Sequence, residues 1–310
     1  MRINKPKFWD QKISLFSLIL LPFTILVKLI IVLKKRLVNS EKFNIPVICI
    51  GNIYLGGTGK TPTAILIANE LVKIGKKPSI VRKYYADQED EYDLIRKHYK
   101  NLSVNLKRSA AILDAENKSH DSVILDDGFQ DYKIKKDLNI ICFNQNQLIG
   151  NGMVIPSGPL RESLGALEDA QVVIINGGKS LEFEQKILQY NKNLNIFYSN
   201  YYPVNSNEFK KKKLLAVAGI ANPKNFFDLL LKEGLEIKKK MIFPDHYQFK
   251  KSEIVNIVKY AEERNLQIIM TEKDYFKIKK FNFNEIKYLK IILKIENCEK
   301  LIKLVSDVYD

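Results

Sequence analysis

Short apolar runs alternate with segments of helical spacing along most of the chain. Runs rich in Val, Ile and Leu fit strands that are buried on both faces, and they occupy residues 45–51, 78–81, 122–125, 138–143 and 171–175. Between them, apolar residues recur three and four positions apart, as expected of helices, at residues 60–73, 93–99 and 109–117. Residues 83–93 are polar and acidic and are expected to form an exposed loop. Strands that alternate with helices predict an α/β fold with a parallel, doubly wound sheet.

A second, smaller α/β unit is expected beyond residue 200, where the texture of the sequence changes. Residues 205–213 are polar, end in four lysines and suit a surface connection. The alternation then resumes, with expected strands at residues 214–219 and 267–270 and expected helices at residues 224–233, 252–264 and 297–309. We therefore expect three parts, which are an N-terminal helix in residues 1–36, a larger domain in residues 37–204 and a smaller domain in residues 205–310.

The N-terminal segment has a different pattern. Residues 13–33 form an apolar run of 21 residues with one charge, Lys28, and basic residues flank the run on both sides. Its length is close to the ~20 residues that span a bilayer, whereas it is too long for a secretory signal and no small-residue cleavage site follows it. On a helical wheel the polar residues share one narrow sector, which contains Asp10, Ser14, Ser17, Thr24, Lys28 and Lys35. The pattern predicts a membrane-associated helix that either spans the bilayer or lies in its interface; a helix packed in a core is the alternative.

Charge and cysteine content narrow the class of protein. The chain has 50 Lys and Arg against 35 Asp and Glu, but only seven of the basic residues are Arg. No basic cluster is interleaved with aromatic residues, so the composition does not indicate nucleic-acid binding. Three widely separated cysteines argue against a disulfide scaffold and favour reduced thiols in a cytoplasmic domain, and three histidines are too few for a His-rich metal site.

Residues 51–61 carry the clearest chemical signal. The sequence Gly51-Asn-Ile-Tyr-Leu-Gly-Gly-Thr-Gly-Lys-Thr61 follows an expected strand and opens an expected helix. In such a loop, glycines let backbone N–H groups surround phosphates, Lys60 reaches the β- and γ-phosphates, and Thr61 offers its hydroxyl to Mg²⁺. Tyr54 stands where the usual pattern has glycine. A nucleotide-binding loop is the better interpretation, and a glycine-rich turn with an incidental lysine is the alternative.

A second expected strand ends in two carboxylates. Residues 122–125 lead into Asp126-Asp127-Gly128, and the carboxyl end of a parallel strand is where α/β proteins bind ligands. Alone, this sequence indicates only a turn. Together with the loop at residues 51–61, it predicts a carboxylate pair that holds Mg²⁺.

Seven motifs occur in an order that resembles a known family. They are GGTGKTP (56–62), DDGFQ (126–130), GNG (150–152), P-x-GPLRE (156–162), AGI near residue 219, FPDHYQF (243–249) and MTEKD (270–274). With the apolar N-terminal helix, the chain from about residue 10 to 275 is similar to the tetraacyldisaccharide 4′-kinase family of lipid A biosynthesis. The resemblance implies a P-loop NTPase-type sheet and transfer of the γ-phosphate of ATP to the 4′-hydroxyl of a tetraacyldisaccharide 1-phosphate, which forms lipid IVA. It also implies a substrate embedded in the membrane and a location at the cytoplasmic face of the bacterial inner membrane, with no nucleic-acid or protein partner expected.

The resemblance further implies roles for single residues. The ATP-binding loop would comprise Tyr54, Leu55, Gly56, Gly57, Thr58, Gly59, Lys60 and Thr61. Thr61, Asp126 and Asp127 would hold Mg²⁺, and the catalytic residues would be Asp90, His246, Lys60 and Arg161. In this scheme Asp90 takes the proton of the sugar hydroxyl and His246 orients it. Lys60 and Arg161 stabilise charge on the phosphoryl group as it transfers.

Four positions depart from the family pattern, namely Tyr54, Lys83, Glu89 and Asp131. Lys83 and Glu89 replace glycines, so we expect reshaped loops there and altered substrate contacts at Lys83. Without the resemblance, Asp90 would be interpreted as one acid of a solvated loop, whereas for His246 a turn-capping role and a functional role would be equally good interpretations.

Two other classes of protein remain open from the residues alone. One is a P-loop protein of a regulatory GTPase or metallochaperone type, although Glu272-Lys273-Asp274 is only a partial match to a base-reading motif. The other is a membrane-associated binding protein without catalysis, against which the two carboxylates argue. Thr271 and Asp274 fit a helix cap, so a structural role is expected for that motif.

Overall fold

The structure of the chain is a computed structural model that describes residues 6–86, 88–245 and 247–310. Contacts divide the chain into two compact units. Unit 1 comprises residues up to 85, 99–200 and 294–310, and unit 2 comprises residues 86–98 and 201–293. The division differs from the three expected parts, because the N-terminal helices belong to unit 1, residues 86–98 belong to unit 2 and residues 294–310 return to unit 1.

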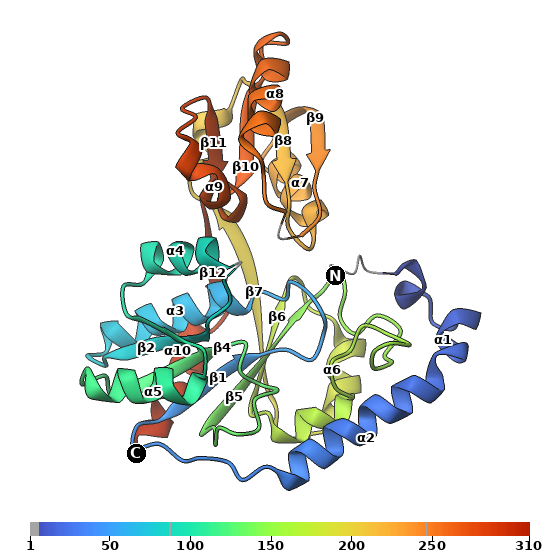
Figure 1. The fold of residues 1–310 in the computed structure, drawn as a ribbon, viewed down its shortest axis with the longest axis vertical. Coiled ribbons are helices and arrows are strands. Elements are labelled where there is room, and N and C mark those ends of the chain that lie inside the picture. The colour runs from blue at the N-terminus through green and yellow to red at the C-terminus, as the bar shows by residue number, and fades with distance from the viewer. Residues whose placement is uncertain (1–5, 87, 246) are drawn as a thin grey trace. The chain divides into compact units, whose positions relative to one another are not determined.

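Unit 1 is built on an eight-stranded sheet with the strand order β12-β7-β6-β5-β1-β4-β2-β3 (Figure 1). All neighbouring strands from β7 to β3 pair in parallel, which confirms the expected doubly wound α/β fold. In β1, β4 and β6 every residue is buried, because the continuous apolar runs lie in a sheet covered on both faces. The strands are β1 (Val47–Gly51), β2 (Pro78–Lys83), β3 (Leu102–Asn105), β4 (Ser122–Asp126), β5 (Leu138–Asn144), β6 (Val172–Asn176), β7 (Asn195–Pro203) and β12 (Ile291–Ile295).

Helices cover both faces of this sheet. On one face, α5 (Arg108–Asn117) and α6 (Leu181–Leu188) share one apolar core with alternate residues of the central strands. Helix α3 (Lys60–Lys73) buries its Ala, Ile and Leu side chains against β1, β2 and β4, and α10 (Cys298–Ser306) packs beside it. Three short 3₁₀ helices complete the unit, which are η1 (Lys7–Asp10), η2 (Leu164–Asp169) and η5 (Asp307–Tyr309).

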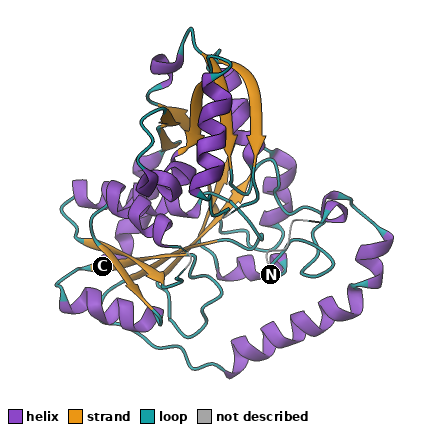
Figure 2. Ribbon diagram, turned by 45° about the horizontal axis from the view of Figure 1, so that its top comes forward, coloured by secondary structure: helices purple, strands orange, loops and turns teal. Residues whose placement is uncertain are grey.

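The N-terminal apolar run forms two helices, α1 (Leu15–Ile19) and α2 (Leu21–Leu37), which meet just before Pro22. Helix α2 is the long helix at the lower right of Figures 1 and 2. None of the helices within residues 6–86, 88–245 and 247–310 combines the length and the apolar character that crossing a bilayer requires. Ser17 and Thr24 of the polar stripe are buried against unit 1. Val27 and Ile31 pack against the core of unit 1. Most other apolar residues between 13 and 37 form an outer apolar face, each between 45% and 77% exposed, which comprises Ile13, Leu15, Phe16, Leu18, Ile19, Phe23, Ile25, Leu26, Leu29, Ile30, Val32, Leu33 and Leu37.

Unit 2 has a four-stranded parallel sheet with the order β11-β10-β8-β9. Its strands are β8 (Lys213–Ala218), β9 (Glu236–Ile242), β10 (Gln267–Thr271) and β11 (Ile286–Leu289). Helix α7 (Pro223–Lys232) packs in the core on one face of the sheet and α8 (Lys251–Glu262) in the core on the other. Helix α4 (Glu89–His98) packs against α9 (Glu272–Ile278). The short 3₁₀ helices of this unit are η3 (Ser206–Phe209) and η4 (Lys279–Phe281).

Two local expectations differ from the structure. Helix α4 begins at Glu89 rather than at residue 93, so part of the expected acidic loop is helical; the acidic residues of its first turn suit the positive end of the helix dipole. The strands β3, β7, β9, β11 and β12 were not predicted from the sequence. Strand β9 has three consecutive lysines and is largely exposed, and it is held at the sheet edge by backbone pairing with β8.

Candidate functional site

The loop between β1 and α3 has the geometry of a phosphate-binding loop. Gly59 has a φ of 90°, a left-handed conformation that glycine adopts without strain, and it immediately precedes Lys60, the first residue of α3. The N–H groups of this helix start lie at the carboxyl edge of a parallel sheet, where anions bind. The side-chain amide of Asn52 stabilises the loop, since it donates to the carbonyl oxygen of Gly56 at 3.2 Å and to Oγ1 of Thr58 at 3.0 Å.

Tyr54 occupies the position where the usual pattern has glycine. Its side chain is fully buried in the core of unit 1, and its ring lies beneath Gly56. The residues on either side of it pair with the motif at residues 156–162, because Leu55 N–H donates to the carbonyl oxygen of Pro159 at 2.8 Å. The buried Tyr54 side chain therefore anchors the loop to the core, whereas Leu55 and Gly57 are exposed to solvent.

Asp126, the last residue of β4, lies next to Thr61. The Thr61 hydroxyl donates to Asp126 Oδ2 at 2.8 Å, and Nε of Arg82 lies 3.6 Å from the same oxygen. Burial raises the pKa of Asp126, although Arg82 and Thr61 oppose the rise. The second oxygen, Oδ1, is buried and accepts no hydrogen bond from any residue that the structure describes. A buried carboxylate oxygen without a donor is suited to a cation.

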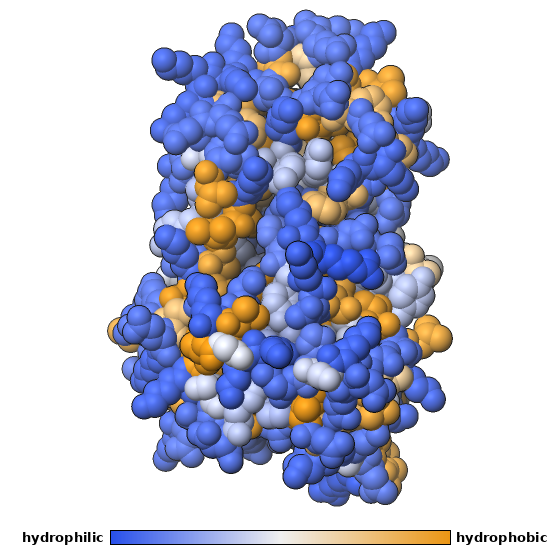
Figure 3. All heavy atoms as spheres, turned by 90° about the vertical axis from the view of Figure 1, so that its left-hand side faces the viewer, coloured by the Kyte–Doolittle hydropathy of each residue, from blue (hydrophilic) through white to orange (hydrophobic). Residues whose placement is uncertain are grey.

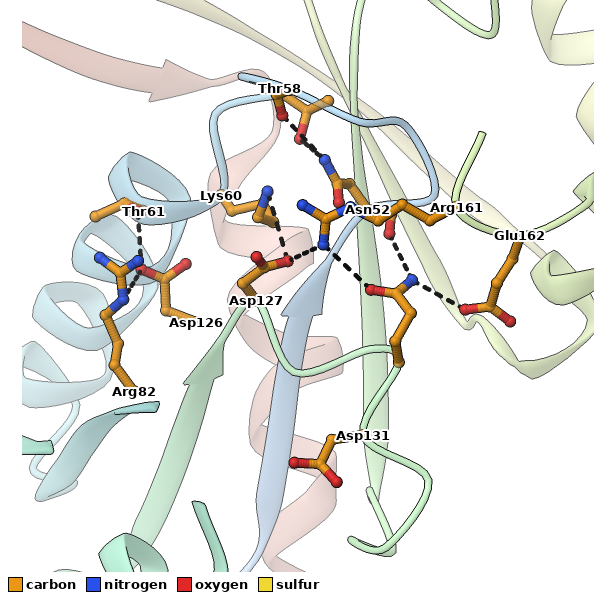
Figure 4. A network of polar contacts seen from close by, with 12 residues as sticks. Asn52, Thr58, Lys60, Thr61, Arg82, Asp126, Asp127, Asp131, Arg161 and Glu162 are labelled. Atoms are coloured by element: carbon orange, nitrogen blue, oxygen red, sulfur yellow. Dashed lines mark hydrogen bonds and ion pairs between the residues drawn. The ribbon is translucent and has the colours of Figure 1, made fainter. Parts of the chain in front are cut away.

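Asp127 has a different environment (Figure 4). Lys60 Nζ lies 3.6 Å and Arg161 Nη1 lies 2.9 Å from its Oδ1 atom. Burial by itself would raise the pKa of Asp127, but Lys60, Arg161 and Arg108 outweigh it and hold that pKa below its ordinary value. Asp127 is therefore a firmly ionised carboxylate among cations.

The oxygen atoms around Thr61 form a donor set that fits Mg²⁺. The Thr61 hydroxyl, the open Oδ1 of Asp126 and the carboxylate of Asp127 are all hard oxygen donors on adjacent segments. Mg²⁺ in nucleotide sites binds through one or two carboxylates and completes its shell with phosphate oxygens and water.

Four residues that the sequence analysis did not assign support this site. Gln130 donates to the carbonyl oxygen of Asn52 and to Oε1 of Glu162, both at 2.9 Å, and it accepts from Arg161. Arg108 donates to the carbonyl oxygen of Asp127 at 2.7 Å. The set of Gln130, Asn52, Arg82 and Arg108 thus fixes the loop and both aspartates. Gln130 lies within the DDGFQ motif, so the motif could have indicated that it belongs to the site, whereas Arg108 lies in no motif.

A cavity of about 330 Å³ adjoins Asp127. Its basic lining is provided by Lys83, Arg108 and Arg161, and its acidic lining by Asp127 and Asp131. Two of the departures from the family pattern, Lys83 and Asp131, therefore face the same cavity. Arg108 and Asp131 pair across part of its wall at 3.3 Å.

The remaining predicted residues lie elsewhere. Asp90 is in the first turn of α4 and so belongs to unit 2, whereas Lys60, Thr61, Asp126, Asp127 and Arg161 gather in unit 1. Burial raises the pKa of Asp90, and its buried Oδ2 accepts no hydrogen bond within the described part of the chain. His246 lies outside the described residues.

The loop, the helix that follows it and the aspartate bonded to its threonine place unit 1 in the class of P-loop nucleotide-binding proteins. Comparison with known proteins identifies the family. The family model described as tetraacyldisaccharide-1-P 4′-kinase matches residues 16–309. The chain therefore belongs to the tetraacyldisaccharide 4′-kinase family, the ATP-dependent kinases of lipid A synthesis.

Individual relatives agree with this assignment. The tetraacyldisaccharide 4′-kinase of Pelagibacter ubique is 42% identical, with 98% of this chain and 99% of that protein covered. The enzyme of the same name from Agrobacterium fabrum is 31% identical, with 87% of this chain and 82% of that protein covered. The crystal structure of LpxK from Aquifex aeolicus in complex with ATP has a TM-score of 0.73 at 26% identity, with 96% of this chain and 100% of that chain covered.

Proposed function

We propose that this chain transfers the γ-phosphate of ATP to the 4′-hydroxyl of a tetraacyldisaccharide 1-phosphate and so forms lipid IVA. Membership of the family supports the substrate class, and the ATP complex of the Aquifex aeolicus relative supports ATP as the donor. The observation that carries the proposal is the arrangement at the mouth of the P-loop. There, Lys60 and Arg161 converge on Asp127, beside Thr61 and the open oxygen of Asp126.

On the donor side, residues 54–61 bind the phosphates of ATP. Their backbone N–H groups and the positive end of α3 attract the phosphate oxygens, and Lys60 extends to the β- and γ-phosphates. Thr61, Asp126 and Asp127 would hold Mg²⁺, which when bound neutralises charge on those oxygens. Arg161 stabilises charge on the transferring phosphoryl group.

On the acceptor side, Asp90 takes the proton from the sugar hydroxyl. Its raised pKa makes its carboxylate a stronger base than an ordinary aspartate. His246 orients or polarises this carboxylate in the proposed mechanism. The cavity beside Asp127 is lined by Lys83, Arg108 and Arg161, whose positive charges would attract the phosphate groups of the substrate.

The outer apolar face of α1 and α2 supports action at a membrane. A water-exposed protein surface normally carries apolar residues singly or in small patches. The face drawn in Figure 3 is mostly hydrophilic, with smaller apolar clusters. The continuous apolar face of residues 13–37, with Lys34, Lys35 and Arg36 at its end, suits a helix that lies in the interface of an anionic membrane. This face supports our proposal that the protein acts at the cytoplasmic face of the bacterial inner membrane, where its acylated substrate and ATP would meet.

The direct test is transfer of label from the γ-phosphate of ATP. The full chain, Mg²⁺ and a synthetic tetraacyldisaccharide 1-phosphate in mixed micelles should give a lipid labelled at its 4′ position. The same lipid without its 4′-hydroxyl serves as the control and should remain unlabelled. Label that appears only as inorganic phosphate, at a rate that the lipid does not change, would contradict the proposal. Equal use of GTP would favour the regulatory P-loop class instead.

The proton-transfer roles have their own test. Asp90→Asn and His246→Ala should each lower kcat by about 10²- to 10⁴-fold, because the sugar hydroxyl then lacks a positioned base. The double variant should lose little more kcat than the more severely impaired single variant, since the effects of residues that act as a unit are non-additive. Steady-state kinetics at saturating ATP measure these losses, and fully multiplicative losses would show that the two residues act separately.

A further inference from the structure

The carboxyl edge of the unit 2 sheet gathers three segments that are distant in sequence. Strands β8, β9 and β10 are parallel neighbours, so their carboxyl ends lie at one edge. Gly219 follows β8, Asp245 comes shortly after β9, and α9 begins directly after β10. Two lysines of α9, Lys273 and Lys277, lie at this edge.

Lys277 has a structural role. It is fully buried, and its ammonium donates to Asp274 Oδ1 at 2.7 Å and to the carbonyl oxygen of Gly219 at 3.0 Å. The Asp274 carboxylate also accepts from Gly219 N–H and from the Thr271 hydroxyl, each at 2.7 Å. This closed network joins α9 to the end of β8.

Lys273 has partners of another kind. Its Nζ lies 2.7 Å from Oε1 of Glu91 and 3.6 Å from Oδ1 of Asp245. Glu91 is buried and follows Asp90 in the first turn of α4, whereas Asp245 lies in the segment after β9. One ammonium thus bridges Glu91 and Asp245, which are adjacent in sequence to Asp90 and His246, the residues of the proton-transfer step in the proposed function.

We propose that Lys273 is a positioning residue for the Asp90 carboxylate, which it holds in place through Glu91 and Asp245. This inference rests on the proposed function, because it assumes that Asp90 is the base. The bridge constrains the first helical turn that carries Asp90, whose Oδ2 has no hydrogen-bond donor among the described residues. A base held in this way keeps its geometry without losing its lone pair to a neighbouring donor.

Lys273 also sets the electrostatic field at Asp90. Burial is the main cause of the raised pKa of Asp90, Lys277 and Lys273 lower that pKa, and Glu91 raises it. Of these groups, Lys277 is paired with Asp274, and Lys273 is shared between Glu91 and Asp245. Removing the charge of Lys273 removes one of the two positive charges that lower the pKa of Asp90, so the base should titrate at higher pH.

Lys97 provides a matched control. It also joins α4 to α9, since its Nζ lies 2.6 Å from Glu272 and donates to the Tyr288 hydroxyl at 2.7 Å. It lies at the opposite end of α4 from Asp90, and Glu272 keeps a second partner, His98, at 3.0 Å. Lys97→Met therefore removes an α4–α9 lysine without touching Glu91 or Asp245.

The experiment compares Lys273→Met, Lys273→Arg and Lys97→Met in the full chain, with thermal melting to verify folding. Lys273→Met should lower kcat by about tenfold or more while KM for ATP changes by less than about twofold. The acid limb of its pH–rate profile should move upward by about half a pH unit. Lys273→Arg should restore the acid limb, and Lys97→Met should behave like wild type.

Two results would overturn the positioning role. The first is wild-type kcat and an unshifted acid limb in Lys273→Met. The second is a loss of kcat and of melting temperature in Lys273→Met and Lys97→Met alike, with no shift of the limb, which is what a purely structural pair produces.

Another variant serves if Lys273→Met does not fold. Glu91→Gln removes a negative charge next to Asp90 while it keeps the shape of the side chain, so the acid limb should move downward. An unmoved limb in that variant would reject the inference.

Failure of the proposed function has a different signature. If Asp90→Asn keeps full kcat, Asp90 is not the base, whatever the Lys273 variants show. If Asp90→Asn is inactive and Lys273→Met is normal, the base assignment holds and only the role of Lys273 is rejected.

Discussion

At the scale of single residues, the site depends on two adjacent aspartates with opposite surroundings. Asp126 is buried with one oxygen open, and burial raises its pKa. Asp127 lies between Lys60 and Arg161, whose charges help to hold its pKa below the ordinary value. Asp126 is suited to bind a metal ion that arrives with the nucleotide. Asp127 holds the side chains of Lys60 and Arg161 in place before the nucleotide binds.

Lys60 is the residue whose loss should be most informative on the donor side. Lys60→Ala should lower kcat by about 10²-fold or more, because the phosphates lose their charged contact and Asp127 loses a cation. Lys73→Ala is the matched control, since Lys73 lies on the same helix and is exposed. Both variants should melt like wild type, and near-normal phosphoryl transfer by Lys60→Ala would contradict the assignment of the loop.

At the scale of elements, residues 156–162 connect the N-terminal helices to the site. The Thr24 hydroxyl lies 2.8 Å from Oγ of Ser157 and 3.1 Å from the carbonyl oxygen of Val154. At the other end of the same segment, Arg161 binds Asp127 and Glu162 binds Gln130. Thr24 of the polar stripe thus fastens α2 to the motif that builds the phosphate site, and most apolar residues of these helices are exposed.

The outer apolar face should control access to the lipid substrate. Leu26→Glu combined with Ile30→Glu replaces two residues that are 56% and 50% exposed, so folding should be retained. Vesicle binding should weaken and KM for the lipid should rise by about tenfold or more, whereas KM for ATP should not change, because burial of apolar area in the interface is lost.

Leu113→Glu is the control for this variant, because Leu113 is a comparably exposed leucine on α5. Sedimentation with anionic vesicles and steady-state kinetics provide the measurements. If the folded double variant still sediments with vesicles and keeps its KM for the lipid, the outer apolar face does not bind the membrane.

At the scale of the whole molecule, the two units use the carboxyl edge of a parallel sheet in different ways. In unit 1 the edge keeps an open carboxylate oxygen on Asp126. In unit 2 the corresponding edge is filled by the protein itself, because Asp274 binds Lys277, Thr271 and the N–H group of Gly219. The first edge is therefore available to a ligand, and the second one stabilises its unit.

Asp274 should consequently matter more for stability than for turnover of the folded enzyme. Asp274→Ala should lower the free energy of unfolding by about 3–5 kcal/mol, because Lys277 stays buried without its partner. Asp274→Leu combined with Lys277→Met should recover part of the loss. Asp228→Ala, at an exposed position of α7, should change stability by less than about 0.5 kcal/mol. Urea denaturation followed by circular dichroism measures these values, and equal effects of Asp274→Ala and Asp228→Ala would contradict the role of the buried pair.

Much of this organisation could be predicted from the sequence. The alternation of apolar runs and helical spacing indicated the doubly wound sheet, and the position of Lys60 and Thr61 after a strand indicated a phosphate loop. Both signals are local, because a buried strand needs consecutive apolar residues and a P-loop needs its glycines and lysine at set spacing. Strand β9 escaped prediction because its backbone pairing, not its side chains, holds it in the sheet.

What the sequence by itself determined is therefore the class of fold, the phosphate loop and the presence of a carboxylate pair at the end of β4. Only the tertiary structure decided that Tyr54 points into the core, that Ser17 and Thr24 of the polar stripe are buried, and that Asp90 belongs to unit 2 with Lys273 beside it. The physical reason is the range of the interactions. Periodicity records which residues avoid water within one element, whereas the partner of a buried hydroxyl or carboxylate is set by contacts between segments that are tens to more than a hundred residues apart.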